Sequence, residues 1–158
     1  MTSLYYGDFT AGQEFTSQGR TLTETDLTMF SMLTGDWNPI HNNAEYAAGS
    51  KFGQRLMHGA FGVGLAIGLM HSLGIFEESA VALLDIRDWQ FKEPVFIGDT
   101  LHLKLTIIDK SLGKSGKTGR LGRTFELVNQ HGRVAHQGRA DVLIKVDRPA
   151  VHAEATDT

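Results

Sequence analysis

The chain has 158 residues, of which 41% are hydrophobic and 21% are charged, and its formal net charge is -3 at pH 7. This length suits one compact domain, and the apolar content is sufficient for a core, which excludes disorder over most of the chain. The 15 lysines and arginines are outnumbered by 18 aspartates and glutamates, so the chain lacks the basic excess of a nucleic-acid-binding protein.

The sequence contains no cysteine, which excludes disulfide bonds, thiolate zinc sites and a cysteine nucleophile. Residues 1–15 include Asp8 and Glu14 and have no apolar run after a basic start, so they do not predict a signal peptide. We therefore expect a cytoplasmic protein.

The first predicted helix follows Thr23, which is a suitable N-cap because acidic residues occupy the first turn after it. Leu27, Phe30 and Leu33 recur at helical spacing. Gly35 is a suitable C-terminal stop. The pattern therefore predicts a helix between Thr23 and Gly35.

A polar loop is expected over residues 36–41, and Asn42 or Asn43 then caps a second short helix that ends at Ala48, before Gly49. The N-terminal third is thus predicted to contain helices and loops.

Residues 56–70 form the most apolar stretch of the chain. The stretch is shorter than the roughly 20 residues that a membrane-spanning helix requires. A helix that is apolar all round is buried, so we expect a long core helix that begins near Gly59 and ends near Gly74. Gly64 and Gly68 are expected to let this helix approach a sheet closely. No contact with a membrane is predicted.

The hydrophobic period changes from about 3.6 to 2 after this helix. Leu101, Leu103, Leu105 and Ile107 alternate with polar residues and predict a half-buried strand. Further strands are expected over residues 81–91, 120–128 and 133–145, with turns at residues 98–99, 112–119 and 129–132.

These elements predict an α+β fold in which one antiparallel sheet wraps around one long buried helix. We expect a single domain over residues 1–146 and a frayed C-terminal tail over residues 147–158. A sheet with one helix on one face leaves an open edge, which favours a homodimer or a multiple of it.

The loop over residues 35–41 holds the densest group of chemically useful side chains. Asp36 and His41 lie five residues apart, and Pro39 restrains the backbone between them. Such a pair is able to hold one water molecule and deprotonate it while the partner delivers a proton elsewhere. The alternative is that Asp36 and Asn38 form turns and that His41 is a surface residue.

Gly59 follows His58 at the expected start of the buried helix. The first N–H groups of a helix have no partner within it, and the helix dipole favours negative charge there. A substrate oxygen could approach this N–H closely, because glycine has no side chain, and an oxyanion would be stabilised. The alternative is that Gly59 serves only tight packing and that His58 is an ordinary buried histidine.

The run FSMLTGDWNPIH at residues 30–41, with Ala47 six residues further on, resembles the signature of MaoC-like (R)-specific enoyl-CoA hydratases. His58-Gly59, residues 91–95 (FKEPV) and residues 98–101 (GDTL) also resemble that family. The resemblance extends from about Tyr6 to Lys145. It implies the hot-dog fold, in which an antiparallel sheet wraps around a long helix.

The resemblance implies a hydro-lyase that adds water reversibly, in the syn sense, to a trans-2-enoyl-CoA and forms an (R)-3-hydroxyacyl-CoA. Asp36 and His41 would hold the catalytic water, with His41 as the general base and Asp36 exchanging a proton with the α carbon. The N–H of Gly59 would receive the thioester oxygen. No metal and no redox cofactor is implied, because coenzyme A or phosphopantetheine arrives as part of the substrate.

The resemblance also assigns supporting positions. Asn38 and Pro39 would shape the loop or contact substrate, and Trp37, His58 and Ile67 are candidates for the pocket wall. Some members carry a small hydroxyl residue near the position of Ile67, facing the catalytic pair. The bulky isoleucine therefore leaves the acyl length and polarity of the substrate unpredicted.

Two other functions fit the same residues. A hot-dog thioesterase could use Asp36 with the Gly59 N–H, although it needs only one base and leaves His41 unexplained. A non-catalytic acyl-CoA or acyl-carrier binding protein would keep the fold, but the intact pair argues against it.

Other site types have weaker support. Asp36, His41 and His58 supply three nitrogen or oxygen ligands for a divalent metal but lack helical His-x3-His spacing. The glycine-rich residues 113–119 fail the phosphate-loop spacing, although their lysines, with Arg120 and Arg123, offer contacts for coenzyme A phosphates. A serine hydrolase is disfavoured because the Gly-x-Ser-x-Gly motif is absent.

Overall fold

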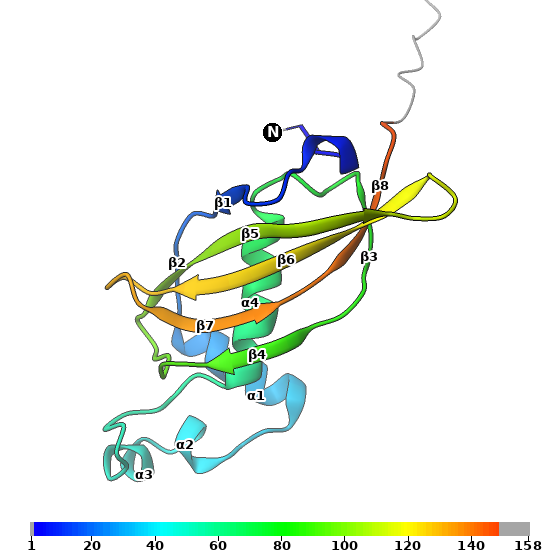
Figure 1. Ribbon diagram of the computed structural model, residues 1–158. Coiled ribbons are helices and arrows are strands. Elements are labelled where there is room, and N and C mark those ends of the chain that lie inside the picture. The colour runs from blue at the N-terminus through cyan, green and yellow to red at the C-terminus, as the bar shows by residue number, and fades with distance from the viewer. Residues whose placement is uncertain (1, 149–158) are drawn as a thin grey trace, which may run out of the picture.

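The computed structural model describes residues 2–148, and Figure 1 shows the sheet curling around the long helix α4. The helical elements are η1 at Tyr6–Asp8, α1 at Glu24–Thr34, α2 at Pro39–Asn42, α3 at Ala44–Ala48 and α4 at Gly59–His71. The strands are β1 at Glu14–Thr16, β2 at Arg20–Thr21, β3 at Ala80–Leu83, β4 at Arg87–Phe91, β5 at Thr100–Leu112, β6 at Thr118–Val128, β7 at Val134–Arg139 and β8 at Val142–Lys145.

The strands run in the order β1-β5-β6-β7-β4, and all the pairings among the described residues are antiparallel. β2 also pairs with β5, while β8 pairs with both β6 and β3. One antiparallel sheet around one long helix is the architecture that the sequence predicted, but α4 is buried only at Gly62, Leu65, Ala66 and Leu69 and not on all sides. Most of the predicted tail lies outside the described residues.

The core lies between the concave face of the sheet and α4. The predicted alternation on β5 is confirmed, because Leu101, Leu103, Leu105 and Ile107 are all at most 1% exposed. They pack with buried side chains of α4 such as Leu65 in one cluster. Each such side chain contributes a few kcal/mol to the free energy of unfolding, which is why this face of the sheet holds the helix.

The helix predictions hold at α1 and α3. Thr23 is the N-cap of α1, and Gly35 ends that helix with a positive φ of 74°, a conformation that favours glycine. Asn43, one of the two predicted caps, accepts a hydrogen bond from the Tyr46 N–H at the start of α3. The long helix ends at His71, three residues before the predicted stop.

The expected loop over residues 36–41 is only partly a loop. Residues 39–42 form the one-turn helix α2. Asn38 caps this turn by accepting a hydrogen bond from the Ile40 N–H, and Pro39 occupies its first position, where a missing N–H costs nothing. The same residues that suggested a turn therefore begin a short helix.

Two of the segments that were expected to form one strand each form two strands in the structure. The segment 81–91 is interrupted between β3 and β4. Within β4, the backbone of Asp88 takes a positive φ of 54°. The segment 133–145 breaks between β7 and β8, where the buried Asp141 accepts hydrogen bonds from Arg87, Arg120 and Arg139. The strands β1 and β2, of three and two residues, were not expected in the N-terminal third.

The carboxyl group of Asp141 is held ionised by these arginines. Burial acts to raise its pKa, but the hydrogen bonds from Arg139 and Arg120 outweigh burial and hold the pKa of Asp141 below its usual value.

Arg120 also pairs with Asp109, and Arg123 is fully buried, so neither is a free phosphate ligand. Figure 1 further shows the β5–β6 hairpin projecting from the end of the sheet opposite to α2 and α3.

The glycines of α4 divide between two faces. A Cβ on Gly62 would lie 2.1 Å from Nδ1 of His136 on the sheet, and one on Gly59 would lie 3.0 Å from the ring of Phe91. Nothing lies within 4 Å of a Cβ built on Gly64 or Gly68. The prediction that Gly64 and Gly68 allow close approach to the sheet is therefore wrong, and Gly59 and Gly62 have that role. The pattern could not distinguish these faces because the helix is apolar all round.

Among residues 2–148, no helix combines the length and the apolar character needed to cross a membrane.

Candidate active site

The site is built on the segment that joins α1 to α2. Gly35 ends α1, so the chain turns at once and Asp36 leaves the helix. The Asp36 carboxylate accepts a hydrogen bond of 3.2 Å from the Asn38 N–H, and Asn38 in turn caps α2. Asn38 and Pro39 thus shape the loop and set the separation between Asp36 and His41.

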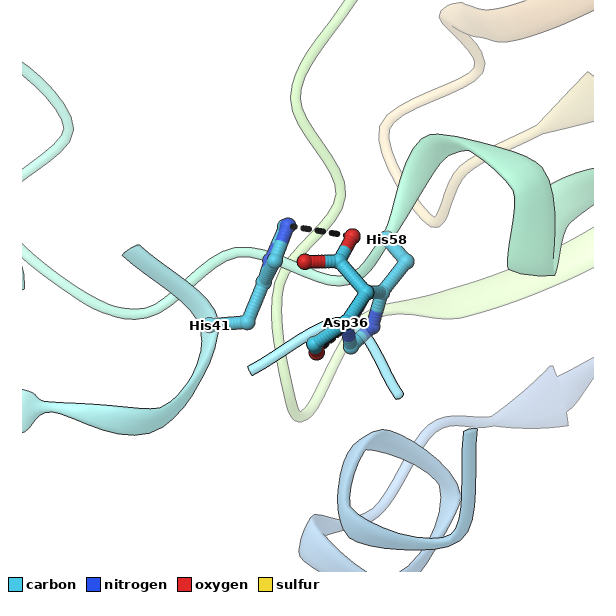
Figure 2. A group of neighbouring side chains, drawn as sticks. All are labelled: Asp36, His41 and His58. Carbon is cyan, nitrogen blue, oxygen red and sulfur yellow. Dashed lines mark hydrogen bonds and ion pairs between the residues drawn. The ribbon is translucent and has the colours of Figure 1, made fainter. Parts of the chain in front are cut away.

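His41 lies on α2 with its imidazole held in one orientation (Figure 2). Its Nδ1 lies 2.8 Å from the carbonyl oxygen of Leu56, and because a carbonyl only accepts, Nδ1 carries the proton. In the neutral imidazole the lone pair is then on Nε2, which lies 3.9 Å from Oδ2 of Asp36. The Asp36 side chain is 52% exposed, and that of His41 is 13% exposed.

His58 lies behind this pair and is only 3% exposed. Its ring stacks on that of His41, with centroids 3.8 Å apart and planes 26° apart. Its Nε2 lies 3.1 Å from the carbonyl oxygen of Asp36 and 3.1 Å from the hydroxyl of Ser31. The structure thus brings together Asp36, His41 and His58.

Gly59 is the first residue of α4, so its N–H has no partner within the helix. It borders a cavity of about 430 Å³ together with His41. The remaining lining residues are Lys51, Phe52, Leu56, Met57, Phe91, Lys92, Glu93, Pro94, Val95 and His136. A proton acceptor and a helix N-terminus therefore face the same cavity.

The other candidate wall residues lie elsewhere. Trp37 is 51% exposed and does not border this cavity. Ile67 packs against the core and lies eight residues along α4 from Gly59, which is about 12 Å at 1.5 Å per residue. Within one copy of the chain, neither residue adjoins the pocket beside His41.

His136 borders the cavity and was not singled out from the sequence. It pairs with Leu127 on one side and Phe91 on the other, so it stands on the inward face of β7. Burial alone lowers the pKa of His136 to about 4. The neighbours that bury it come from distant parts of the chain, and no local motif marks it.

Asp36, His41 and His58 each offer a ligand atom within 4.8 Å of the others. The two imidazole rings are stacked, however, so their lone pairs lie in two separate and nearly parallel planes instead of converging on one point. Nε2 of His58 is also directed at the Asp36 carbonyl. The geometry suits proton transfer better than chelation of a metal ion.

The fold is that of a hot-dog domain, and it brings Asp36 and His41 together beside one cavity. Residues 8–127 match the family described as MaoC like domain. The chain is 31% identical over 140 residues to the (R)-specific enoyl-CoA hydratase of Rhodospirillum rubrum, covering 89% of this chain and 91% of that protein. The chain therefore belongs to the MaoC-like dehydratase family of hydro-lyases, as the sequence resemblance predicted.

Further comparisons agree with this assignment. The unliganded R-hydratase PhaJ1 of Pseudomonas aeruginosa matches with a TM-score of 0.77 at 25% identity, covering 92% of this chain and 88% of that one. A Mycobacterium tuberculosis protein with a double hot-dog fold matches with a TM-score of 0.79 at 19% identity, over 93% of this chain and 46% of that one, and confirms the fold. Over 108 residues, 68% of this chain, the identity to protein MaoC of Klebsiella aerogenes is 34%, but the match spans only 32% of that relative.

Proposed function

We propose that the protein catalyses the reversible syn addition of water to a trans-2-enoyl-CoA, which gives an (R)-3-hydroxyacyl-CoA. The observation that carries this proposal is the position of Nε2 of His41, 3.9 Å from Oδ2 of Asp36 and beside a cavity that Gly59 also borders. The name of the Rhodospirillum rubrum relative, an (R)-specific enoyl-CoA hydratase, supports the same reaction.

The separation of the two groups suits a shared water. At 3.9 Å they are too far apart for a direct hydrogen bond, but a water oxygen about 2.8 Å from each would fit between them. His41 takes a proton from this water as its oxygen bonds to C3 of the substrate. The double bond shifts toward the thioester, and the N–H of Gly59 stabilises the resulting oxyanion.

Asp36 completes the reaction: its carboxylate receives the proton that His41 took from water and delivers it to C2, so both groups return to their starting states. The balance is one hydroxyl group on C3 and one hydrogen on C2, both from water. Because Asp36 and His41 hold the same water, both additions occur on one face of the substrate, which accounts for the syn outcome. The reverse sequence dehydrates the hydroxyacyl thioester.

The scheme requires no metal and no redox cofactor, since the thioester itself accepts the negative charge. Coenzyme A or a carrier phosphopantetheine would enter as part of the substrate. Lys51 and Lys92 border the cavity and supply positive charge for the phosphates. The cytoplasmic location stays a prediction.

The test is an assay of the purified protein on a panel of trans-2-enoyl-CoAs of different length and branching. We expect loss of the absorbance of the conjugated enoyl thioester without release of free thiol. Thiol release would instead assign a thioesterase. If neither signal appears with coenzyme A or carrier-protein thioesters, the protein is a binding protein and the proposal is wrong.

We also propose that two copies associate through the edge of the sheet at β4. Among the described residues β4 pairs only with β7, and its other edge is open. Phe91 is 59% exposed on this strand, and Val81 and Leu83 on β3 are about half exposed. The double hot-dog relative, in which this chain covers 46% of the length, supports pairing of two such units. Light scattering should give twice the chain mass of 17.4 kDa, and a monomer would contradict the proposal.

A further inference from the structure

We propose that His58 is a positioning residue that fixes Asp36, His41 and the start of α4 relative to one another. This inference rests on the proposed hydration. It assigns a role to His58, a residue of the site that takes no part in the reaction scheme. His58 is absent from the lining of the cavity that contains His41 and Gly59, so it acts through these neighbours and not on substrate.

The first contact is with His41. The two rings are stacked with their centroids 3.8 Å apart, so His58 restrains the plane of the His41 imidazole. The hydrogen bond from Nδ1 of His41 to the Leu56 carbonyl fixes the rotation of the ring within that plane. The two restraints together direct Nε2 of His41 toward Asp36, as Figure 2 shows.

The second contact is with Asp36. The carbonyl oxygen of Asp36 is only an acceptor, so Nε2 of His58, at 3.1 Å, carries the proton and donates it. This hydrogen bond fixes the backbone from which the Asp36 carboxylate projects. The carboxylate itself is half exposed, so its position depends strongly on that backbone.

The third connection is through the backbone, because His58 is the N-cap of α4 and the next residue is Gly59. A displacement of His58 therefore moves the N–H that we assign to the oxyanion. Phe30 packs against the His58 ring, with the centroids 5.0 Å apart, so the ring contacts both Phe30 and His41. One rigid side chain thus connects the base, the acid and the oxyanion donor.

The remaining nitrogen shows that this arrangement has a cost. Nδ1 of His58 is buried and has no hydrogen-bond partner among residues 2–148. A buried polar atom without a partner destabilises the fold, whereas a phenylalanine of similar size would leave none. What the histidine provides, and a hydrocarbon ring would not, is hydrogen bonding of Nε2 to the Asp36 carbonyl and the Ser31 hydroxyl.

Two substitutions separate the contributions of the ring and the donor. His58→Phe keeps the stack and removes the donor, and His58→Gln keeps an N–H donor and removes the ring. We expect His58→Phe to lower kcat about tenfold or more with KM within about twofold of wild type, because small displacements of reacting groups are costly. We expect His58→Gln to recover part of that loss.

A core variant provides the control for general destabilisation. Ile144→Val alters a fully buried side chain on β8, outside the site, and should leave kcat unchanged. Wild-type kcat in His58→Phe would overturn the proposal. So would equal values for His58→Phe and His58→Gln, since the donor would then be irrelevant.

A spectroscopic test does not depend on the reaction. Long-range proton–nitrogen NMR spectra distinguish the two neutral tautomers of a histidine, and His41→Gln and His58→Phe assign the signals. We expect His58 with its proton on Nε2 and His41 with its proton on Nδ1. A His58 proton on Nδ1 would overturn the positioning role, whereas inactivity of the wild-type protein on every thioester would instead reject the proposed function.

Discussion

Replacing either Asp36 or His41 is expected to lower kcat for enoyl-CoA hydration at least about a hundredfold, because each change removes one of the two groups that carry protons. In Asp36→Asn the amide keeps an oxygen that can accept the Asn38 N–H but is unable to exchange a proton with C2. In His41→Ala no side chain remains to deprotonate water. The KM values should change much less than kcat.

Neither substitution should unfold the protein. The Asp36 side chain is half exposed, and His41 contributes one side-chain hydrogen bond, to the Leu56 carbonyl. Initial rates on the best substrate and urea denaturation of the same preparations check both statements. Glu45→Gln is a matched control, since Glu45 is an exposed carboxylate on the neighbouring α3 and should keep wild-type rates. Near-wild-type turnover in Asp36→Asn or His41→Ala would refute the assigned roles.

Local patterns predicted the elements whose signals lie within a few residues. Thr23 and Gly35 delimit α1 because a cap and a left-handed stop depend only on the chain near them. The alternation along β5 identified its buried face for the same reason. The separation of Asp36 and His41 by five residues also belongs to this class, since one loop and one turn of helix determine it.

The features that the sequence did not predict depend on distant residues. The break between β7 and β8 is stabilised by Asp141, whose partners Arg87 and Arg120 lie 54 and 21 residues away. The inward position of His136 depends on pairing with Phe91 and Leu127. Periodicity within one strand carries no information about such partners.

The protein is expected to lose about 2 kcal/mol of unfolding free energy between pH 7.5 and pH 5 because of His136. Burial lowers the pKa of His136 to about 4 in the folded protein, whereas an unfolded histidine titrates near 6.5. Between these two pKa values the histidine is protonated in the unfolded chain but not in the folded protein. The stability is therefore fully present above about pH 6.5 and is lost as the pH falls toward 4.

The cause is the packing around the imidazole. His136 lies against Gly62 of α4 and meets the rings of Trp89 and Phe91 edge-on, and its Nδ1 has no partner among the described residues. A proton added there would be a buried charge without a counterion. The carboxyl of Asp141, whose pKa is already below its usual value, loses its contribution only at a lower pH than this window.

Urea denaturation at pH 7.5 and pH 5, at one protein concentration because association affects apparent stability, measures this difference. His136→Phe keeps a ring against Gly62 but does not titrate, so the difference between the two pH values should shrink by about 2 kcal/mol. His131→Gln, which alters an exposed histidine, should retain the wild-type difference. If His136→Phe shows the same pH dependence as wild type, another group is responsible and His136 is protonated in the folded protein at little cost.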